Sequence, residues 1–166
     1  DTLLPVDRVV ELVFMACLAL DYAQRREVVH RDIKPANLLL TPEAKLKISD
    51  FGAAQYSEAS HTYLMGVGSP LYMSPEQVED KRLNHQTDIY SLGAVMYQLL
   101  TGKPPFQGSN RESLLYQIVS IDPAPPTLHR PDLPPAIERI VLRALAKSRE
   151  NRYAEWRDFA ADLEGL

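Results

Sequence analysis

The feature that most constrains the fold is a stretch near the middle of the chain that is apolar on almost every side. Residues 87–100 read TDIYSLGAVMYQLL. A helix that is hydrophobic all round is stable only when other elements surround it. We expect this helix to begin with Thr87 or Asp88 as its cap and to end at Gly102. A chain of 166 residues is long enough to build one domain around it.

Helical periodicity recurs on both sides of this central segment. Apolar residues repeat at helical spacing over residues 6–24, and further helices are predicted at 111–119, 136–146 and 154–163. Short strands are predicted at 28–29, 38–40 and 45–48. Residues 122–135 contain six prolines and must form an irregular connection. The sequence therefore predicts a mainly α fold with a small β element.

Composition excludes several classes of partner. The net charge of −4 gives no electrostatic case for binding nucleic acid or an anionic membrane. Cys17 is the single cysteine, so no intrachain disulfide can form. No stretch of the sequence reaches the roughly 18 apolar residues of a membrane span. We therefore expect a cytoplasmic protein without nucleic-acid partners and without membrane contact from this segment. Anchoring of the parent protein in a membrane, through sequence outside these residues, stays open.

Two loops carry the residues with chemical function. The first, HRDIKPAN over residues 30–37, lies between two predicted strands, and the second begins at Asp50, just after the next one. Asp32 can accept the proton of an attacking hydroxyl, and Lys34 can neutralise charge on a phosphoryl group. Asn37 and Asp50 offer the oxygen ligands that Mg²⁺ prefers beside phosphate oxygens. Together the loops predict phosphoryl transfer, which depends mainly on positioning and electrostatics.

These segments resemble the motifs of eukaryotic-like serine/threonine protein kinases. Residues 30–37 are similar to the catalytic loop of that family, and DFG at 50–52 to its metal-binding motif. GSPLYMSPE at 68–76 resembles the substrate-docking segment, and DIYSLG at 88–93 resembles the start of the central helix. Arg152 falls where the family has a late arginine. A single triplet is weak evidence, but the full ordered set is specific and covers most of the chain.

The resemblance implies a fold and a set of site residues. Residues 1–166 would form the C-terminal lobe of a kinase catalytic domain, with an activation segment at 50–76 and without the small N-terminal β lobe. ATP and Mg²⁺ would be the cofactors, and proteins the substrates. The implied site residues are Asp32 and Lys34 for catalysis, Asn37 and Asp50 for the metal, Leu39 beneath the adenine, and Ser69, Pro70 and Tyr72 for substrate docking.

The resemblance also implies residues that support the site. They are His30, Arg31, Phe51, Gly52, Glu76, Asp88 and Arg152. His30 and Phe51 would stack in the apolar column between the lobes. Asp88 would accept hydrogen bonds from backbone N–H groups of the catalytic loop, and Glu76 with Arg152 would form a buried ion pair.

Regulation by phosphorylation is a further expectation. Kinases with an arginine at the position of Arg31 often need a phosphorylated activation segment, because phosphate pairs with arginine. Candidate acceptors are Ser57, Ser60, Thr62 and Tyr63, of which Ser60 and Thr62 are the predicted phosphorylation sites. No Lys or Arg occurs between Asp50 and Asp80, so little but Arg31 could hold the phosphate from within this lobe.

The sequence ahead of His30 contains neither a Gly-x-Gly-x-x-Gly run nor a Val-Ala-Ile-Lys-like strand. In the family, these parts cover the phosphates of ATP and fix two of them. We therefore expect an active parent kinase, whereas the 166-residue chain alone transfers phosphate negligibly. The missing N-terminal lobe would be its partner, and the surface that meets this lobe would favour self-association.

Two other functions are compatible with parts of the sequence. The chain could be a pseudokinase-like binding module, although Asp32, Lys34, Asn37 and Asp50 are all intact. A small-molecule phosphotransferase has a comparable set of two aspartates and an asparagine, but Lys34 and the docking segment favour protein substrates. The amino-acid sequences of the motifs, including YMSPEQ from Tyr72 onward, are more similar to those of bacterial kinases than to those of animal kinases.

Overall fold

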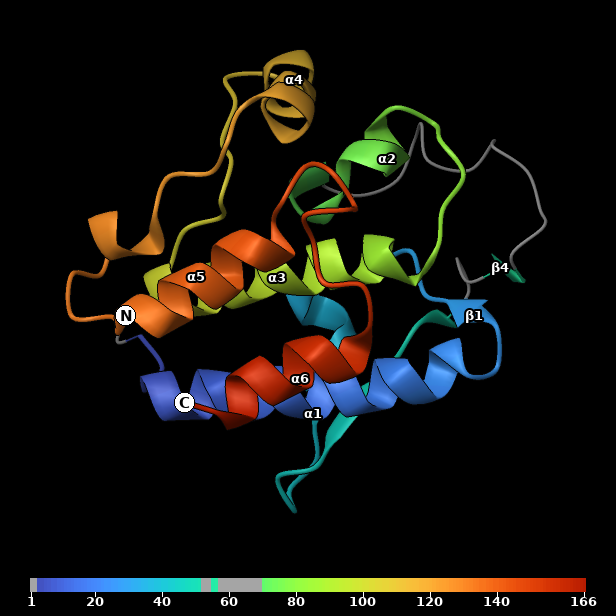
Figure 1. Cartoon of the computed structure of the whole chain (residues 1–166), viewed down its shortest axis with the longest axis vertical. Helices are drawn as coiled ribbons and strands as arrows, with labels where there is room; N and C mark the ends of the chain where they lie inside the picture. The colour runs from blue at the N-terminus through green and yellow to red at the C-terminus, as the bar shows by residue number, and fades with distance from the viewer. Residues whose placement is uncertain (1–2, 52–54, 57–69) are drawn as a thin grey trace.

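The computed structural model describes residues 3–51, 55–56 and 70–166. Helix α3 (His85–Thr101) passes through the middle of the molecule (Figure 1). It packs against α1 (Val6–Gln24) on one side and α5 (Pro135–Ala144) on the other. Helix α6 (Trp156–Glu164) lies along α1 and also packs against α5. The mainly α fold with a small β element is thus confirmed.

The central helix is as buried as its sequence predicts, because every residue from 87 to 97 is buried. Its predicted end at Gly102 is confirmed, since this glycine takes the left-handed conformation with φ of 74°. The predicted cap is wrong. Asn84 caps the helix by accepting a hydrogen bond from the Gln86 N–H at 3.0 Å. Thr87 and Asp88 lie inside the first turn, where their side chains bond to other elements.

Gly93 lies where α3 and α5 approach each other closely. A Cβ atom on Gly93 would lie 2.7 Å from the Cβ of Ala144, too close for two carbons to pack. We expect Gly93→Ala to lower the free energy of unfolding by about 1–3 kcal/mol, because the methyl group forces the two helices apart. Chemical denaturation measures this change.

Gly165→Ala is the matched control for this prediction. Gly165 directly follows α6 and has φ of −79°, and the atom nearest to its added Cβ outside the adjoining residues would be 3.5 Å away. Alanine fits there without strain, so the free energy of unfolding should stay within about 1 kcal/mol of wild type. If both changes lower the free energy of unfolding equally, the close contact between α3 and α5 is not the reason for a glycine at position 93.

The remaining helices follow the predicted positions with small shifts at their ends. Helix α4 (Arg111–Ser120) ends one residue later than predicted, and α5 and α6 begin at Pro135 and Trp156. Proline suits the first turn of α5 because the N–H group that it lacks would have no hydrogen-bond partner within the helix at this position. The proline-rich connection contains only a short 3₁₀ turn, η4 (Pro126–Leu128).

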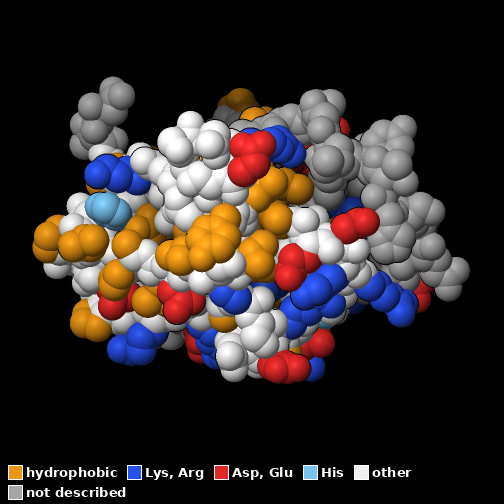
Figure 2. Space-filling model, turned by 90° about the horizontal axis from the view of Figure 1, so that it is seen from above, with side chains coloured by type: hydrophobic (Ala, Val, Ile, Leu, Met, Phe, Trp, Pro, Cys, Tyr) orange, Lys and Arg blue, Asp and Glu red, His pale blue; other side chains and the backbone are white. Residues whose placement is uncertain are grey.

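Helix α4 stands apart from the bundle at the top of the molecule (Figure 1). Its contacts are mainly with α2 (Pro75–Val78) and with the 3₁₀ turn η3 (Pro70–Tyr72). Tyr116 on α4 is 63% exposed. Seen from this side, hydrophobic side chains gather at the centre of the face, with charged groups around them (Figure 2).

The β element consists of two small antiparallel pairs. Strand β2 (Leu38–Leu40) pairs with β3 (Leu46–Ile48), as the predicted strands allow. Strand β1 (Val28–Val29) pairs with β4 (Gln55–Tyr56). Strand β4 and turn η3 were not predicted, because the strands and helices expected from the sequence leave residues 50–75 without regular structure. Among the helices of the described ranges, none is long and apolar enough to cross a membrane.

Candidate active site

The predicted catalytic loop runs from β1 to β2 and ends in a 3₁₀ turn, η1 (Pro35–Asn37). The β2–β3 register continues beyond Leu38 and Ile48, because the N–H of Ser49 donates to the carbonyl oxygen of Asn37 at 2.9 Å. Asp50 directly follows Ser49. The hairpin therefore brings Asn37 and Asp50 to the same end, although they are thirteen residues apart in the sequence.

Asp32 is the centre of a small polar cluster within the loop. The Lys34 Nζ lies 3.0 Å from the Asp32 Oδ2. The Asn37 Nδ2 donates to the backbone oxygen of Asp32 at 2.8 Å and lies 3.3 Å from its Oδ2. The Asp32 and Lys34 side chains are 38% and 32% exposed, so both reach solvent. A carboxylate that is held in place yet accessible can receive a proton from a substrate.

The donor set of Asn37 and Asp50 fits a magnesium ion that is shared with phosphate oxygens. The amide nitrogen of Asn37 makes both bonds to Asp32, so its side-chain oxygen is not needed for them. Asp50 is exposed. Within the described ranges, no group of three or more His, Cys, Asp or Glu could hold a metal alone. Mg²⁺ commonly uses only one or two protein ligands together with substrate phosphates and water.

Two residues of the site have strained backbone conformations. Arg31 has φ of 69° and Asp50 has φ of 63°. Such left-handed conformations cost about 1–3 kcal/mol for residues other than glycine and persist only where neighbouring contacts impose them. Both residues belong to the two loops with predicted catalytic function, whereas Glu27, Ala44 and Asp80 have similar φ values outside these loops.

Asp88 on α3 imposes part of this geometry. Its two carboxylate oxygens accept hydrogen bonds from the N–H groups of His30 at 2.7 Å and Arg31 at 2.8 Å. These are the contacts that the sequence analysis expects. Asp88 is 2% exposed, and burial raises its pKa, while the two backbone donors act in the opposite direction. The carboxylate thus ties the catalytic loop to the core helix.

His30 is fully buried and joins the two loops. Its Nδ1 accepts a hydrogen bond from the Asp32 N–H at 3.2 Å, and its Nε2 lies 2.9 Å from the carbonyl oxygen of Ser49. The ring satisfies both partners when it is neutral and carries its proton on Nε2. It also meets the edge of the Phe51 ring, with 4.5 Å between centroids. This histidine therefore positions Asp32 and the residue before Asp50.

The described part of the docking segment is anchored on α3. The Tyr72 hydroxyl donates to the Gln98 Oε1 at 2.5 Å, and the Ser91 Oγ donates to the Tyr72 carbonyl oxygen at 2.7 Å. Pro70 begins η3. Leu39 on β2 is 48% exposed. Four predicted residues lie outside the described ranges: Gly52, Ser60, Thr62 and Ser69.

Glu76 and Arg152 form the predicted pair. The Arg152 guanidinium contacts the two Glu76 oxygens at 2.7 and 3.2 Å, and the Thr87 hydroxyl donates to the same carboxylate at 2.9 Å. Burial alone would raise the pKa of Glu76, but these bonds and the arginine charge hold it below its usual value. Arg149 lies 3.5 Å from Glu76 and was not predicted.

Gln77 was also not predicted as a site residue, although its side chain donates a hydrogen bond to the catalytic loop. A signal for it was present. Ser74 and Gln77 form a capping box, in which a serine and a glutamine three residues later satisfy each other's backbone N–H groups. This pattern predicts the start of α2 and a fixed direction for the Gln77 side chain. It does not predict the third partner, which comes from a distant loop.

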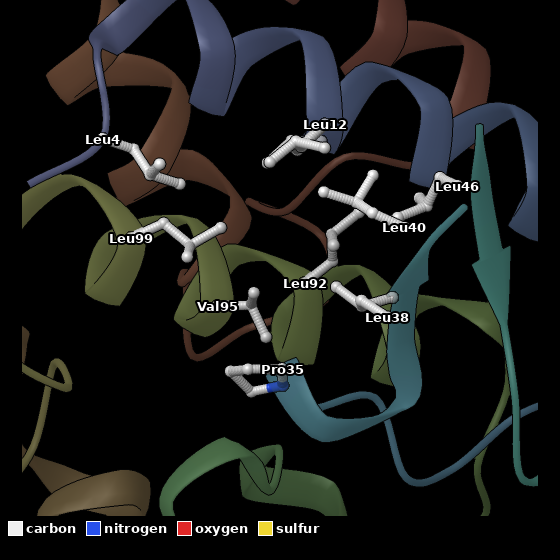
Figure 3. A pocket seen from close by; sticks show the side chains of 10 residues that line it. Leu4, Leu12, Pro35, Leu38, Leu40, Leu46, Leu92, Val95 and Leu99 are labelled. Carbon is white, nitrogen blue, oxygen red and sulfur yellow. The ribbon is translucent and has the colours of Figure 1, made fainter. Parts of the chain in front are cut away.

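A separate apolar cavity of about 190 Å³ lies behind the catalytic loop, between α1, α3 and the β2–β3 hairpin (Figure 3). It offers no group for acid–base chemistry. Ten side chains line it: Leu4, Leu12, Val13, Pro35, Leu38, Leu40, Leu46, Leu92, Val95 and Leu99.

With this geometry in view, the class of the protein follows. The chain matches the model of the protein kinase domain over residues 2–158, and it belongs to that family. It is 37% identical over 161 residues to the serine/threonine-protein kinase PknB of Mycolicibacterium smegmatis. It is 40% identical over 160 residues to PknB of Mycobacterium tuberculosis H37Rv, and 41% identical over 149 residues to a probable PknB of Bifidobacterium longum.

These alignments cover 94%, 94% and 87% of this chain, but only 26%, 26% and 22% of the relatives. The chain thus spans about a quarter of the length of the curated relatives it matches. The predicted resemblance to bacterial serine/threonine kinases is confirmed.

Proposed function

We propose that the protein to which this chain belongs transfers the terminal phosphoryl group of ATP to serine or threonine hydroxyls of proteins. The observation that carries this proposal is the contact set of Asp32, Lys34 and Asn37, with Asp50 at the same end of the hairpin. The names of the relatives support the serine/threonine class.

In this proposal each residue of the cluster has one task. Asp32 orients the substrate hydroxyl and accepts its proton, while Lys34 neutralises the charge of the transferred group. Asn37 and Asp50 would hold Mg²⁺, which supplies positive charge beside the phosphate oxygens when it is bound. Leu39, exposed on β2, would lie against the adenine. Because phosphoryl transfer depends on positioning and electrostatics, a preformed cluster suits it.

The substrate protein would dock beside this cluster. Pro70 and Tyr72 belong to η3, which α3 anchors through Ser91 and Gln98. We include Ser69 in this docking segment and propose Ser60 and Thr62 as regulatory phosphorylation sites that Arg31 would contact. An arginine favours phosphate through paired, charge-assisted hydrogen bonds.

The test is an assay of the full-length gene product with Mg²⁺ and γ-labelled ATP. We expect label on serine and threonine of a general protein acceptor, none on small-molecule acceptors, and loss of transfer when EDTA removes the metal. The 166-residue chain, assayed in parallel, is expected to be nearly inactive. A full-length protein that binds partners but transfers no label would favour the pseudokinase-like binding module instead.

A further inference from the structure

Gln77, in the first turn of α2, connects the docking segment with the catalytic loop. Its Oε1 accepts a hydrogen bond from the Ser74 N–H at 3.0 Å, and its Nε2 donates to the backbone oxygen of Arg31 at 2.9 Å. Gln77 is only 6% exposed. The two bonds fix the direction of the amide, because a backbone N–H needs the oxygen and a carbonyl needs the nitrogen.

The carbonyl group that Gln77 holds belongs to the peptide unit immediately before Asp32. The N–H of Asp32, in the same peptide unit, donates to the His30 Nδ1 at 3.2 Å. On the other side of Arg31, its N–H donates to the Asp88 Oδ1 at 2.8 Å. Arg31 has a strained φ of 69°, a conformation that needs such contacts to persist. Gln77 therefore supplies one of the bonds that set the backbone in front of Asp32.

We propose that Gln77 is a positioning residue that keeps the Asp32 carboxylate in its reactive orientation while the docking segment is in place. The inference deepens the proposed kinase function and rests on it. If α2 shifts, the Gln77 amide leaves the Arg31 carbonyl, and the peptide plane before Asp32 can rotate. Displacement of a catalytic group by about 1 Å can lower a rate roughly 100-fold. Docking and catalysis thus share one buried side chain.

The variant Gln77→Glu separates the two bonds of this amide. Glutamate keeps an acceptor for the Ser74 N–H and is itself a usual member of a capping box. Its second oxygen would face the Arg31 carbonyl oxygen, so two acceptors meet where a donor is needed. Only the protonated carboxyl group can donate there. Lowering the pH therefore restores the missing bond in this variant alone.

In the full-length protein, we expect Gln77→Glu to lower kcat by about 10- to 100-fold at pH 8, with little change in the KM for ATP. The ratio of variant to wild-type kcat should rise as the pH falls toward 6. Ser74→Ala is the control, because it removes the capping hydroxyl and leaves the Gln77–Arg31 bond. It should lower Tm by a few degrees and give a kcat ratio that does not depend on pH.

Hydrogen exchange provides a readout that needs no catalysis. The amide of Asp32 in the full-length protein should exchange about 5- to 10-fold faster in Gln77→Glu than in wild type, and at the wild-type rate in Ser74→Ala. Unchanged exchange in Gln77→Glu, or a kcat ratio that is flat with pH, overturns the proposal. If the wild-type protein transfers no phosphate, the proposed function fails, while exchange at Asp32 still decides the role of Gln77.

Discussion

Replacing Asp32 with Asn in the full-length protein lowers kcat by about 100- to 10,000-fold, the range that loss of a general base produces. An amide has nearly the same shape as a carboxylate but cannot accept the substrate proton. It also leaves Lys34 without the negative partner that lies 3.0 Å away in the wild type. The KM for ATP should change little, because Asp32 is not among the residues that we propose to hold the metal. Steady-state kinetics with varied ATP, at a saturating concentration of the protein substrate, measure both constants.

A change at an exposed carboxylate far from the cluster serves as the control. Asp7 lies in the first turn of α1, and Asp7→Asn should leave kcat within about twofold of wild type. Circular dichroism checks that both variants are folded. If Asp32→Asn keeps a kcat near that of Asp7→Asn, the carboxylate is not the base, and the reaction class proposed here is wrong.

The sequence predicted the elements that local patterns determine. The helix at 85–101 is apolar on most faces, and such a helix is stable only when other elements surround it. Its central position was therefore predictable from its sequence pattern alone. The polar cluster was predictable for a related reason. Asn37 and Asp50 flank two short strands, and pairing of those strands brings the two residues to one end of a hairpin.

The features that the sequence did not predict depend on contacts between distant segments. Thr87 and Asp88 are both good capping residues, and nothing local reveals that they instead bond to Glu76 and to the catalytic loop. Strand β4 is only two residues long and exists because β1 pairs with it. Strand propensity depends strongly on such tertiary context. The bond from Gln77 to Arg31 joins residues that are 46 positions apart.

The Glu76–Arg152 pair yields the largest expected effect on stability. We expect Arg152→Met to lower the free energy of unfolding by about 3–5 kcal/mol, because it leaves a buried carboxylate without its partner. The Arg152 side chain is fully buried and that of Glu76 is 5% exposed. Arg149, at 3.5 Å and one-third exposed, can replace little of the lost contact. Urea denaturation at pH 7 measures the change.

The pH dependence of this effect separates a stranded charge from a simple loss of packing. In the wild type the Glu76 pKa lies below its usual value of 4.5, so the pair stabilises the fold above that pH and the stabilisation is lost as the pH falls further. In Arg152→Met, the hydrogen bond and the charge of the arginine no longer oppose the effect of burial, so the Glu76 pKa rises even though the Thr87 hydroxyl still donates to this carboxylate. As the pH falls, Glu76 is therefore protonated at a higher pH in the variant than in the wild type. The difference in the free energy of unfolding between the two proteins should then shrink.

Three further variants complete the test, and one of them is Glu76→Gln alone. Lys81→Met removes the partner of Glu79 from an exposed pair at 2.8 Å and should cost less than about 1 kcal/mol. The double change Glu76→Gln with Arg152→Met strands no charge, so it should lose less stability than Arg152→Met alone. Two outcomes would contradict the view that a desolvated charge pair holds α2 against the segment between α5 and α6. One is a double variant that loses the sum of the losses of its two single changes, and the other is an Arg152→Met that is no less stable than Lys81→Met.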